Sequence, residues 1–396
     1  MPVTVKLPRL LAAAALVGAL LVPIGSAAAH SSSSGAHAAV KRIFVIMLEN
    51  HSQKTTIGDP NLPYLTSLAH DYAQATSYYG VTHPSQPNYV AAITGQMDPA
   101  FMNDHATNHF AYTNLVDQLE SHGKTWGAYM EALPYAGFTG PIYPDATALP
   151  PSGAALYTNK HNPFVLMDDV LSSPSRLANI KPYTALAADL NSSHAPDFVW
   201  ISPDQCNDMH GGVYATVPGH AETPCPYNTT VDDKYDTALK QKSDAFIHTA
   251  VDTIRNSKAW TGNSVIFILS DEADFDGSAT STDLWADVSG CCDSPGYGSA
   301  PALPYHFPLV DNPIDCSPPD APHTCSEPRL WDAGQFGGGL VPAVVVTSNG
   351  ARGIVDDTPY NHYSLLRTIE QVWNLGYLGN AADGANVSSM TNLLQH

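Results

Sequence analysis

The stretch Arg42-IFVIML-Glu49-Asn50-His51 places six apolar residues directly before an acid, an amide and an imidazole. Four further apolar runs end in polar side chains in the same way: VIFIL (265–269) before Ser270, Asp271 and Glu272; WGAYM (126–130) before Glu131; FVWI (198–201) before Ser202; and VPAVVV (341–346) before Thr347, Ser348 and Asn349. Short runs that are rich in Val, Ile and aromatic residues indicate buried strands.

Stretches with helical patterns separate these five runs, which predicts an α/β fold with a mostly parallel sheet covered on both faces. In open α/β sheets, ligands bind just beyond the carboxyl ends of the strands. We therefore expect the polar side chains after the five runs to share one site. At least three of them are carboxylates, and such a cluster indicates a bound cation.

Helical patterns occur at residues 60–76, 114–122, 232–257 and 363–373. The longest of them, 232–257, carries Tyr235, Leu239, Phe246 and Val251 on a single apolar stripe, as expected of a helix that packs on a sheet. A shorter helix is expected at 90–95, directly after the segment THPSQPNY (82–89).

The first 29 residues have the pattern of a secretory signal peptide. Lys6 and Arg9 precede an apolar stretch at 10–24, and small residues at 27–29 suit cleavage. An uncleaved membrane anchor is the alternative, but the stretch is short and Pro23 interrupts it. We expect an exported protein without a later transmembrane segment. It would comprise a linker at 30–39 and one body at 40–396, with a Cys- and Pro-rich insertion at about 285–339.

The chain has 17 basic and 37 acidic residues and a formal net charge of −20. A surface of this sign repels nucleic-acid phosphates and anionic membranes, so nucleic acid is not expected as a partner. Acidity most often serves solubility alone. The oligomeric state does not follow from these features.

Six cysteines, an even number, predict disulfides in an exported protein. We expect Cys206 to pair with Cys225, and the neighbours Cys291 and Cys292 to pair with Cys316 and Cys325 rather than with each other. Zinc binding is the alternative, but the chain has no C-x-x-C spacing that would favour it.

Ser85 is expected at the start of the helix that follows it, where backbone N–H groups and the helix dipole favour an anion. A serine at that position can also be a simple helix cap. The acidic residues expected near Ser85 favour a nucleophile instead, because a cation bound by them would lower the pKa of the hydroxyl and polarise a phosphoryl oxygen. Glu49, Asn50, Asp271 and Glu272 would supply oxygen ligands, which suit Ca²⁺, Mg²⁺ or Mn²⁺ better than zinc.

Seven blocks of the chain together resemble one known family. They are VIMLENHSQ (45–53), THPSQPNYVAAITG (82–95), KHNPFV (160–165), PDFVWISPDQCNDMHGG (196–212), ILSDEADFDG (268–277), VPAVVVTSNGARG (341–353) and YNHYSLLRTIEQVWNL (360–375). In this order they are similar to the secreted bacterial acid phosphatases and phospholipases C, phosphoesterases of the alkaline phosphatase superfamily. The resemblance implies an α/β/α sandwich and makes 40–396 the phosphoesterase catalytic domain.

The family's residue roles can be transferred to matching positions. The resemblance implies that Glu49, Asn50, Asp271 and Glu272 bind one divalent metal ion together with Ser85, which is the nucleophile. It further implies that His161, His210 and His362 bind the phosphate or protonate the leaving group.

Two departures from the family pattern bear on these roles. Asp274 and Asp276 follow the acidic pair where relatives often have glycines, so either could share the metal. Tyr89 replaces the arginine that usually follows the P-N pair in the phospholipase branch, which favours monoester substrates.

The sequence therefore predicts a secreted, metal-dependent acid phosphatase that hydrolyses phosphate monoesters through a phosphoserine intermediate. Phosphatidylinositol 3-phosphate is one candidate substrate. The alternatives are a phospholipase C acting on a phosphodiester headgroup and an exported phosphate-binding protein without catalysis.

Overall fold

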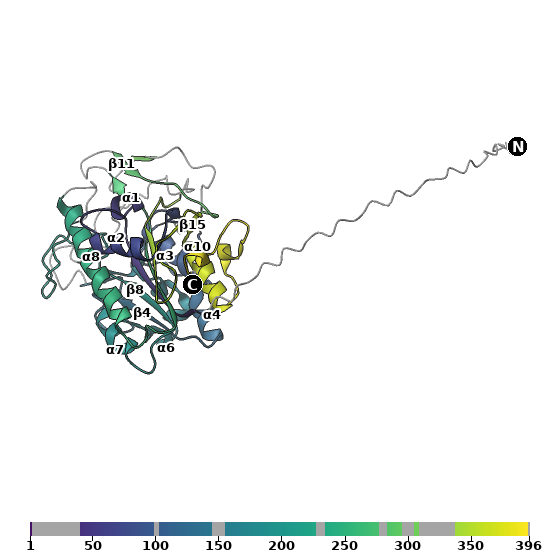
Figure 1. Ribbon diagram of the computed structural model, residues 1–396, viewed down its shortest axis with the longest axis horizontal. Helices are drawn as coiled ribbons and strands as arrows, with labels where there is room; N and C mark the ends of the chain where they lie inside the picture. The colour runs from purple at the N-terminus through teal and green to yellow at the C-terminus, as the bar shows by residue number, and fades with distance from the viewer. Residues whose placement is uncertain are drawn as a thin grey trace. The chain divides into compact units, whose positions relative to one another are not determined.

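An eight-stranded sheet runs through the centre of the computed structural model (Figure 1). Its strands, in spatial order, are β14 (Ile354–Asp356), β2 (Ala73–Ala75), β13 (Ala343–Thr347), β9 (Asn263–Ser270), β1 (Val40–Leu48), β8 (Phe198–Ser202), β4 (Trp126–Met130) and β7 (Ile180–Pro182). The structure describes Met1 and residues 40–98, 103–144, 155–226, 234–276, 283–294, 305–308 and 337–394. Residues 37–396 form one compact unit.

Alternate side chains of β1 enter two separate apolar cores. Phe44, Ile46 and Leu48 pack with α2 (Pro63–Asp71), α7 (Leu186–Leu190) and α8 (Lys234–Arg255) on one face. Residues 43, 45 and 47 pack on the other face with α3 (Ser85–Thr94), α4 (Leu115–Ser121) and α10 (His362–Trp373). Figure 1 shows α2, α7 and α8 on one side of the sheet and α3, α4 and α10 on the other. The predicted α/β/α sandwich is confirmed.

Four of the five predicted strands are parallel neighbours, with β9, β1, β8 and β4 side by side. The fifth prediction is wrong in direction, because β13 pairs antiparallel with β9. The chain returns to β13 from the segment 337–342, which already lies at the carboxyl edge of β9, so no crossover is needed. Thr347, Ser348 and Asn349 consequently lie at the opposite edge, where Ser348 Oγ accepts a hydrogen bond from Ser264 N (2.9 Å).

The predicted helices form with shifted bounds. The helix expected at 60–76 spans only Pro63–Asp71. Residues 73–75 form β2 instead, which lies between β14 and β13 in the sheet. Asn114 and Asn361 cap α4 and α10 through their side chains. The smaller elements are α1 (Gln53–Thr56), α5 (Asp168–Leu171), α6 (Pro174–Leu177), β3 (Tyr78–Tyr79), β5 (Ile142–Tyr143), β6 (Tyr157–Thr158), β10 (Phe275–Asp276), β11 (Asp283–Ala286), β12 (Tyr305–Pro308) and β15 (Tyr360–Asn361).

Apart from Met1, the expected signal peptide and linker lie outside the described residues. Within the expected insertion, the structure describes residues 285–294, 305–308 and 337–339, where β11 pairs antiparallel with β12. Among the described residues, no helix has the length and apolar character needed to span a membrane.

The disulfide between Cys206 and Cys225 is confirmed. The expected pairing of Cys291 and Cys292 with Cys316 and Cys325 is wrong, because Cys291 is bonded to Cys292. Asn361 Nδ2 donates to both cysteine carbonyls (3.1 and 3.0 Å), and the φ of Cys292 is +59°, so a tight turn holds the two neighbours together. Their expected partners at 316 and 325 lie outside the described residues.

Glu370 on α10 makes stability depend on pH. Its side chain is buried beneath Leu378, whose backbone N–H donates to Glu370 Oε1 (2.8 Å), and burial raises the pKa of Glu370 from 4.5 to about 8. The folded protein thus keeps a proton that the unfolded chain releases. This contribution to stability is complete below pH 4.5 and is lost as pH rises through about 8.

Glu370→Gln should therefore flatten the dependence of melting temperature on pH. We expect little difference from wild type at about pH 5 and a higher melting temperature for the variant at about pH 8, because glutamine has no proton to lose. Calorimetry across this range measures the effect, with the exposed Asp357→Asn as the control variant. Parallel profiles for wild type and Glu370→Gln would show that Glu370 does not titrate in the folded protein.

Candidate active site

The ends of β1 and β9 bring the acidic doublets together. Leu48 and Ser270 are partners in the parallel register, so the residues that follow them, Glu49 and Asp271, leave the sheet side by side. Asn50 N donates to Asp271 Oδ1 (3.2 Å), and Asp271 N donates to the carbonyl of Leu48 (3.0 Å). One carboxylate oxygen from each of the acidic residues 49, 271 and 272 lies within 4.8 Å of the others. All three side chains are buried.

Ser85 is the first residue of α3 and points between these carboxylates. Its Oγ lies 2.9 Å from Glu49 Oε2 and 3.0 Å from Glu272 Oε1. A hydroxyl has a single proton, so it cannot donate to both oxygens at once. The structure therefore joins Ser85 to the predicted metal ligands within hydrogen-bond distance.

Asn88 fixes the loop in front of Ser85. Its Oδ1 accepts hydrogen bonds from Val81 N (2.8 Å) and Thr82 N (3.1 Å), while its Nδ2 donates to the carbonyls of Thr82 (2.6 Å) and Pro84 (3.1 Å). All four hydrogen-bonding positions of the amide are used within this loop. The asparagine of the P-N pair thus has a structural role that accounts for its place in the motif.

The oxygen atoms around Ser85 fit a divalent cation. Burial and the neighbouring Asp271 raise the pKa of Glu49 well above its ordinary value, and burial together with Glu272 does the same for Asp271. Asp271 Oδ2 is buried without a hydrogen-bond partner. The amide of Asn50 is oriented so that its Nδ2 donates to Glu49 Oε2 (3.2 Å) and Glu272 Oε1 (3.1 Å). Buried carboxylates within ligating reach of one another, with an unpartnered oxygen among them, are expected where a cation belongs, and a set without sulfur suits a hard ion.

His161 and His210 stand beside Glu49. His161 Nε2 lies 3.1 Å from Glu49 Oε1, and its Nδ1 lies 3.1 Å from Asp208 Oδ2. Its ring stacks on Tyr89, with 5.5 Å between centroids, and lies 5.4 Å from the ring of His210. Burial, with nearby Lys160, lowers the pKa of His161 well below its ordinary value and that of His210 to about 3.

His362 lies behind the acidic doublet and does not face Ser85. Its Nε2 contacts the backbone carbonyl of Asp271 (2.6 Å) and its Nδ1 contacts Tyr78 Oη (3.0 Å). Both ring nitrogens are thus engaged, and burial lowers the pKa of His362 to about 4. These contacts favour a positioning role for His362 over direct contact with phosphate.

Three residues near the site were not among those predicted. Lys160 Nζ contacts His210 Nε2 (3.2 Å) and Asp104 Oδ2 (2.9 Å), and Asp104 Oδ1 accepts from Gln86 N (2.9 Å) at the start of α3. Although burial lowers the pKa of Lys160, Asp104 and Glu49 raise it above its ordinary value. His83, the third, pairs through Nδ1 with Glu272 Oε2. Lys160 and His83 lie inside the motif blocks at 160–165 and 82–95, so the sequence could have identified them as site residues. Asp104 lies in no motif block, and nothing in the sequence distinguishes it.

Other polar ends of the strands do not join Ser85. Ser202 Oγ donates to the backbone carbonyl of His161 (2.7 Å) and so supports that histidine. Glu131 turns away toward Asp204, whose N–H it accepts (3.0 Å). Asp274 accepts from Ser52 N (2.9 Å) and Thr55 Oγ1 (2.8 Å) at α1, which directs both of its oxygens away from the acidic cluster. The expectation of one shared site for all five strand ends is therefore wrong.

Comparison with known proteins identifies the family. The model of the Phosphoesterase family matches residues 59–222 and 226–376, so the chain belongs to that family. The matched ranges include Ser85, His161, His210, His362 and the acidic pair at 271 and 272, whereas Glu49 and Asn50 precede them.

Similar proteins carry phosphatase names. A probable acid phosphatase of Kluyveromyces lactis is 35% identical over 173 residues, which are 44% of this chain and 39% of that protein. A phosphatidylinositol-3-phosphatase of Mycobacterium tuberculosis is 31% identical over 173 residues, 44% of this chain and 52% of that protein. A solved structure from Vibrio parahaemolyticus, described as a protein in the alkaline phosphatase superfamily, aligns with a TM-score of 0.44 and 12% identity over 86% of this chain and 69% of that one. The matches span less than two thirds of the length of these curated relatives.

Cation binding at the acidic cluster should raise the melting temperature. A bound cation offsets the repulsion among the buried carboxylates, so we expect Mg²⁺, Mn²⁺ or Ca²⁺ added after chelation to bind the folded state. At a cation concentration about one hundred times the dissociation constant, binding to the folded state alone stabilises it by about 2.7 kcal/mol. Asp271→Asn keeps the Oδ1 acceptor for Asn50 N and removes one charge, so it should reduce this gain. Scanning fluorimetry with and without cation measures the difference. An equal gain in wild type and Asp271→Asn would remove Asp271 from the cation site.

Proposed function

We propose that this protein is an exported, metal-dependent phosphomonoesterase of the acid phosphatase type, with Ser85 as the nucleophile. The observation that carries the proposal is the position of Ser85 Oγ, at a helix N-terminus and within 3.0 Å of two buried carboxylates. The names of the similar proteins support the reaction class, and the signal-peptide pattern supports export.

The metal site of this proposal consists of Glu49, Asn50, Asp271, Glu272 and Ser85. A divalent ion bound there would lower the pKa of the Ser85 hydroxyl and polarise a phosphoryl oxygen. The oxygen-only donor set favours Mg²⁺, Mn²⁺ or Ca²⁺ over zinc.

Ser85 then attacks the phosphorus of a monoester. A bond forms between Ser85 Oγ and phosphorus while the bond from phosphorus to the ester oxygen breaks, and the proton of Ser85 passes to an adjacent carboxylate, Glu49 or Glu272. Water attacks the resulting phosphoserine, which releases inorganic phosphate and restores the hydroxyl. The dipole of α3 favours the phosphoryl anion at this position.

Lys160 and His210 form the cationic side of the proposed phosphate pocket. Lys160 is charged and buried, and His210 is the more exposed of the two neighbouring histidines. We assign proton donation to the leaving oxygen to His210, with Lys160 3.2 Å from its Nε2. A bound phosphate dianion would favour the charged form of the imidazole, which burial and Lys160 otherwise disfavour.

Ser85→Ala should abolish turnover of p-nitrophenyl phosphate, since no other hydroxyl occupies its place between Glu49 and Glu272 among the contacts of the described residues. Acid quench of wild type during turnover, followed by peptide mass spectrometry, should find one phosphoryl group on Ser85. Ser121→Ala, on an exposed residue of α4, is the control. Substantial turnover by Ser85→Ala would contradict the proposal.

The same wild-type and variant pair tests the substrate class. Phosphatidylinositol 3-phosphate, other monoesters and phosphatidylcholine should be compared after cation add-back. Release of phosphate from monoesters supports the proposal, whereas release of phosphocholine from phosphatidylcholine alone would favour the phospholipase C alternative. Phosphate binding without hydrolysis of any ester would favour the non-catalytic alternative.

Lys160→Met should lower kcat/KM for monoesters by about 10- to 100-fold, because it removes a buried, charge-assisted contact to the phosphate that is worth about 1.5–3 kcal/mol. The inhibition constant of inorganic phosphate should rise in parallel. Because Lys160→Met leaves Asp104 unpaired, the double variant Lys160→Met/Asp104→Asn serves as a second test with the charge balance restored. Unchanged phosphate inhibition in both variants would exclude Lys160 from the pocket.

A further inference from the structure

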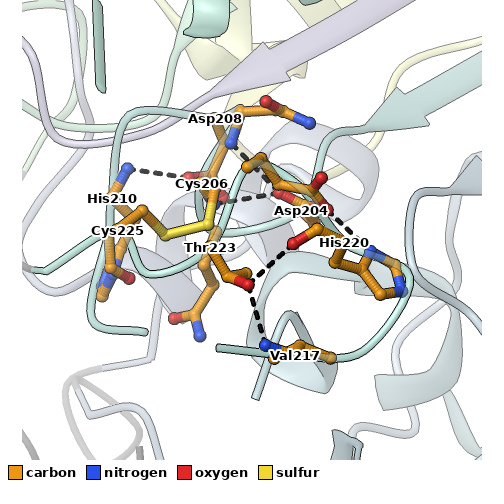
Figure 2. The surroundings of a disulfide bond; sticks show 12 residues. Asp204, Cys206, Asp208, His210, Val217, His220, Thr223 and Cys225 are labelled. Carbon is orange, nitrogen blue, oxygen red and sulfur yellow. Dashed lines mark hydrogen bonds and ion pairs between the residues drawn. A yellow bond between two sulfur atoms is a disulfide. The ribbon is translucent and has the colours of Figure 1, made fainter. Parts of the chain in front are cut away.

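A second cluster of ligand-type side chains lies in the loop that follows β8. Asp204, His220 and Glu222 each place one nitrogen or carboxylate oxygen within 4.8 Å of the others. The disulfide between Cys206 and Cys225 closes this loop (Figure 2). None of these three residues belongs to the Ser85 site, and in Figure 2 His210 lies on the other side of the disulfide from His220.

Asp204 is the buried member of the cluster and has an unused oxygen. Its Oδ1 accepts hydrogen bonds from Cys206 N (3.0 Å) and Asn207 N (3.1 Å), as in a turn cap. Its Oδ2 is buried and has no hydrogen-bond partner, although the residue is only 1% exposed. An unpaired carboxylate oxygen away from water is costly, so this atom points to a missing ligand.

The surrounding charge has one sign. Burial raises the pKa of Asp204 well above its ordinary value, and Glu131 and Glu222 raise it further. Glu131 Oε2 accepts from Asp204 N (3.0 Å) and from Asn207 Nδ2 (2.9 Å), which places a third carboxylate beside the cluster. His220 Nδ1 lies 2.6 Å from Glu222 Oε1, but this pairing leaves Asp204 Oδ2 without a partner. A hydrogen bond between His220 and Glu222 therefore does not account for the whole arrangement.

We propose that Asp204, His220 and Glu222 form a second divalent-cation site, separate from the Ser85 site, that binds zinc or a similar transition metal. Imidazole nitrogens and carboxylate oxygens both bind zinc, at bond lengths of about 2.0–2.2 Å, and imidazole favours a transition metal over Ca²⁺ or Mg²⁺. Ca²⁺ prefers six to eight oxygen ligands and fits this set less well. The metal replaces the contact between His220 and Glu222 and supplies the partner that Asp204 Oδ2 lacks.

The loop around this site is already built to present its ligands. Val213 and Cys225 exchange both backbone hydrogen bonds (3.0 and 2.8 Å), which closes the loop beside the disulfide. Thr223 Oγ1 donates to the carbonyl of His220 (2.8 Å) and accepts from Val217 N (2.8 Å), as Figure 2 shows. These contacts hold His220 and Glu222 against Asp204, so metal binding requires only small side-chain movements.

The site would also fix the turn that carries Asp208. Asp208 N donates to the carbonyl of Asp204 (2.8 Å), and Asp208 accepts from Glu49 N through its own carbonyl (2.8 Å). Asp208 Oδ2 in turn lies 3.1 Å from His161 Nδ1. A metal at Asp204 thus acts as a structural ion at the base of the turn beside His161.

The test is zinc binding to the full chain after chelation. In a Glu49→Gln/Asp271→Asn background, which disables the Ser85 site, titration calorimetry with ZnCl₂ should find one equivalent bound. Adding Glu222→Gln should weaken this binding about tenfold or more. The matched control adds His248→Ala/Asp252→Asn, which removes an exposed imidazole–carboxylate pair on α8 (3.3 Å apart) and should leave zinc binding unchanged.

A second measurement does not need the Glu49→Gln/Asp271→Asn background. Glu222→Gln alone should lose one equivalent of bound Zn²⁺ relative to wild type, as measured by mass spectrometry of metals; the Glu222 side chain is 22% exposed. His220→Gln should change the d–d absorption spectrum of bound Co²⁺, because it replaces an imidazole ligand. Zinc stoichiometry unaffected by both Glu222→Gln and His220→Gln would overturn the proposal, as would binding of Ca²⁺ but not Zn²⁺. This outcome is independent of whether Ser85 is the nucleophile.

Discussion

The burial of like charges at the carboxyl ends of β1 and β9 is the constraint on which the centre of this structure depends. Glu49, Asp271 and Glu272 lie within ligating reach of one another, where water cannot screen their repulsion. Hydrogen bonds from Ser85 and the amide of Asn50 satisfy part of this charge but not Asp271 Oδ2. The parallel register of β1 and β9 holds the three carboxylates in place. The sheet is therefore a rigid support for a cluster of negative charge that a bound cation would neutralise.

The parts of the fold that followed from local patterns were predictable. The burial of β1 on both faces follows from its continuous apolar run, and the amphipathic α8 follows from apolar periodicity. Neither depends on which strand is the partner. The meeting of Glu49 with Asp271 was predictable as well, since parallel strands end at the same edge. Ser85 at the start of α3 followed from the motif and from the polar segment before the helix.

Other features depend on contacts between distant segments, which no local pattern encodes. The reversal of β13 is set by where the chain returns to the sheet, although its apolar run matches that of a parallel strand. Glu131 ends a parallel strand as Glu49 does, yet the backbone of Asp204 and the amide of Asn207 draw it into a different cluster. Asp104 has no motif, because its importance arises from contact with Lys160, 56 residues away in the sequence.

The turn from Asp204 to Asp208 connects two charged regions of the structure. At its start, Asp204 faces Glu222 and His220; at its end, Asp208 faces His161 and accepts from Glu49 N. Burial and Glu49 raise the pKa of Asp208, and Asp204 raises it further, so the two regions are close enough to influence one another electrostatically. Neutralising charge at Asp204 would therefore favour the ionised form of Asp208, and with it the orientation of the histidine beside Glu49. The disulfide at Cys206 lies within this turn and anchors it to the loop that carries His220 and Glu222, so one covalently closed segment links the two clusters.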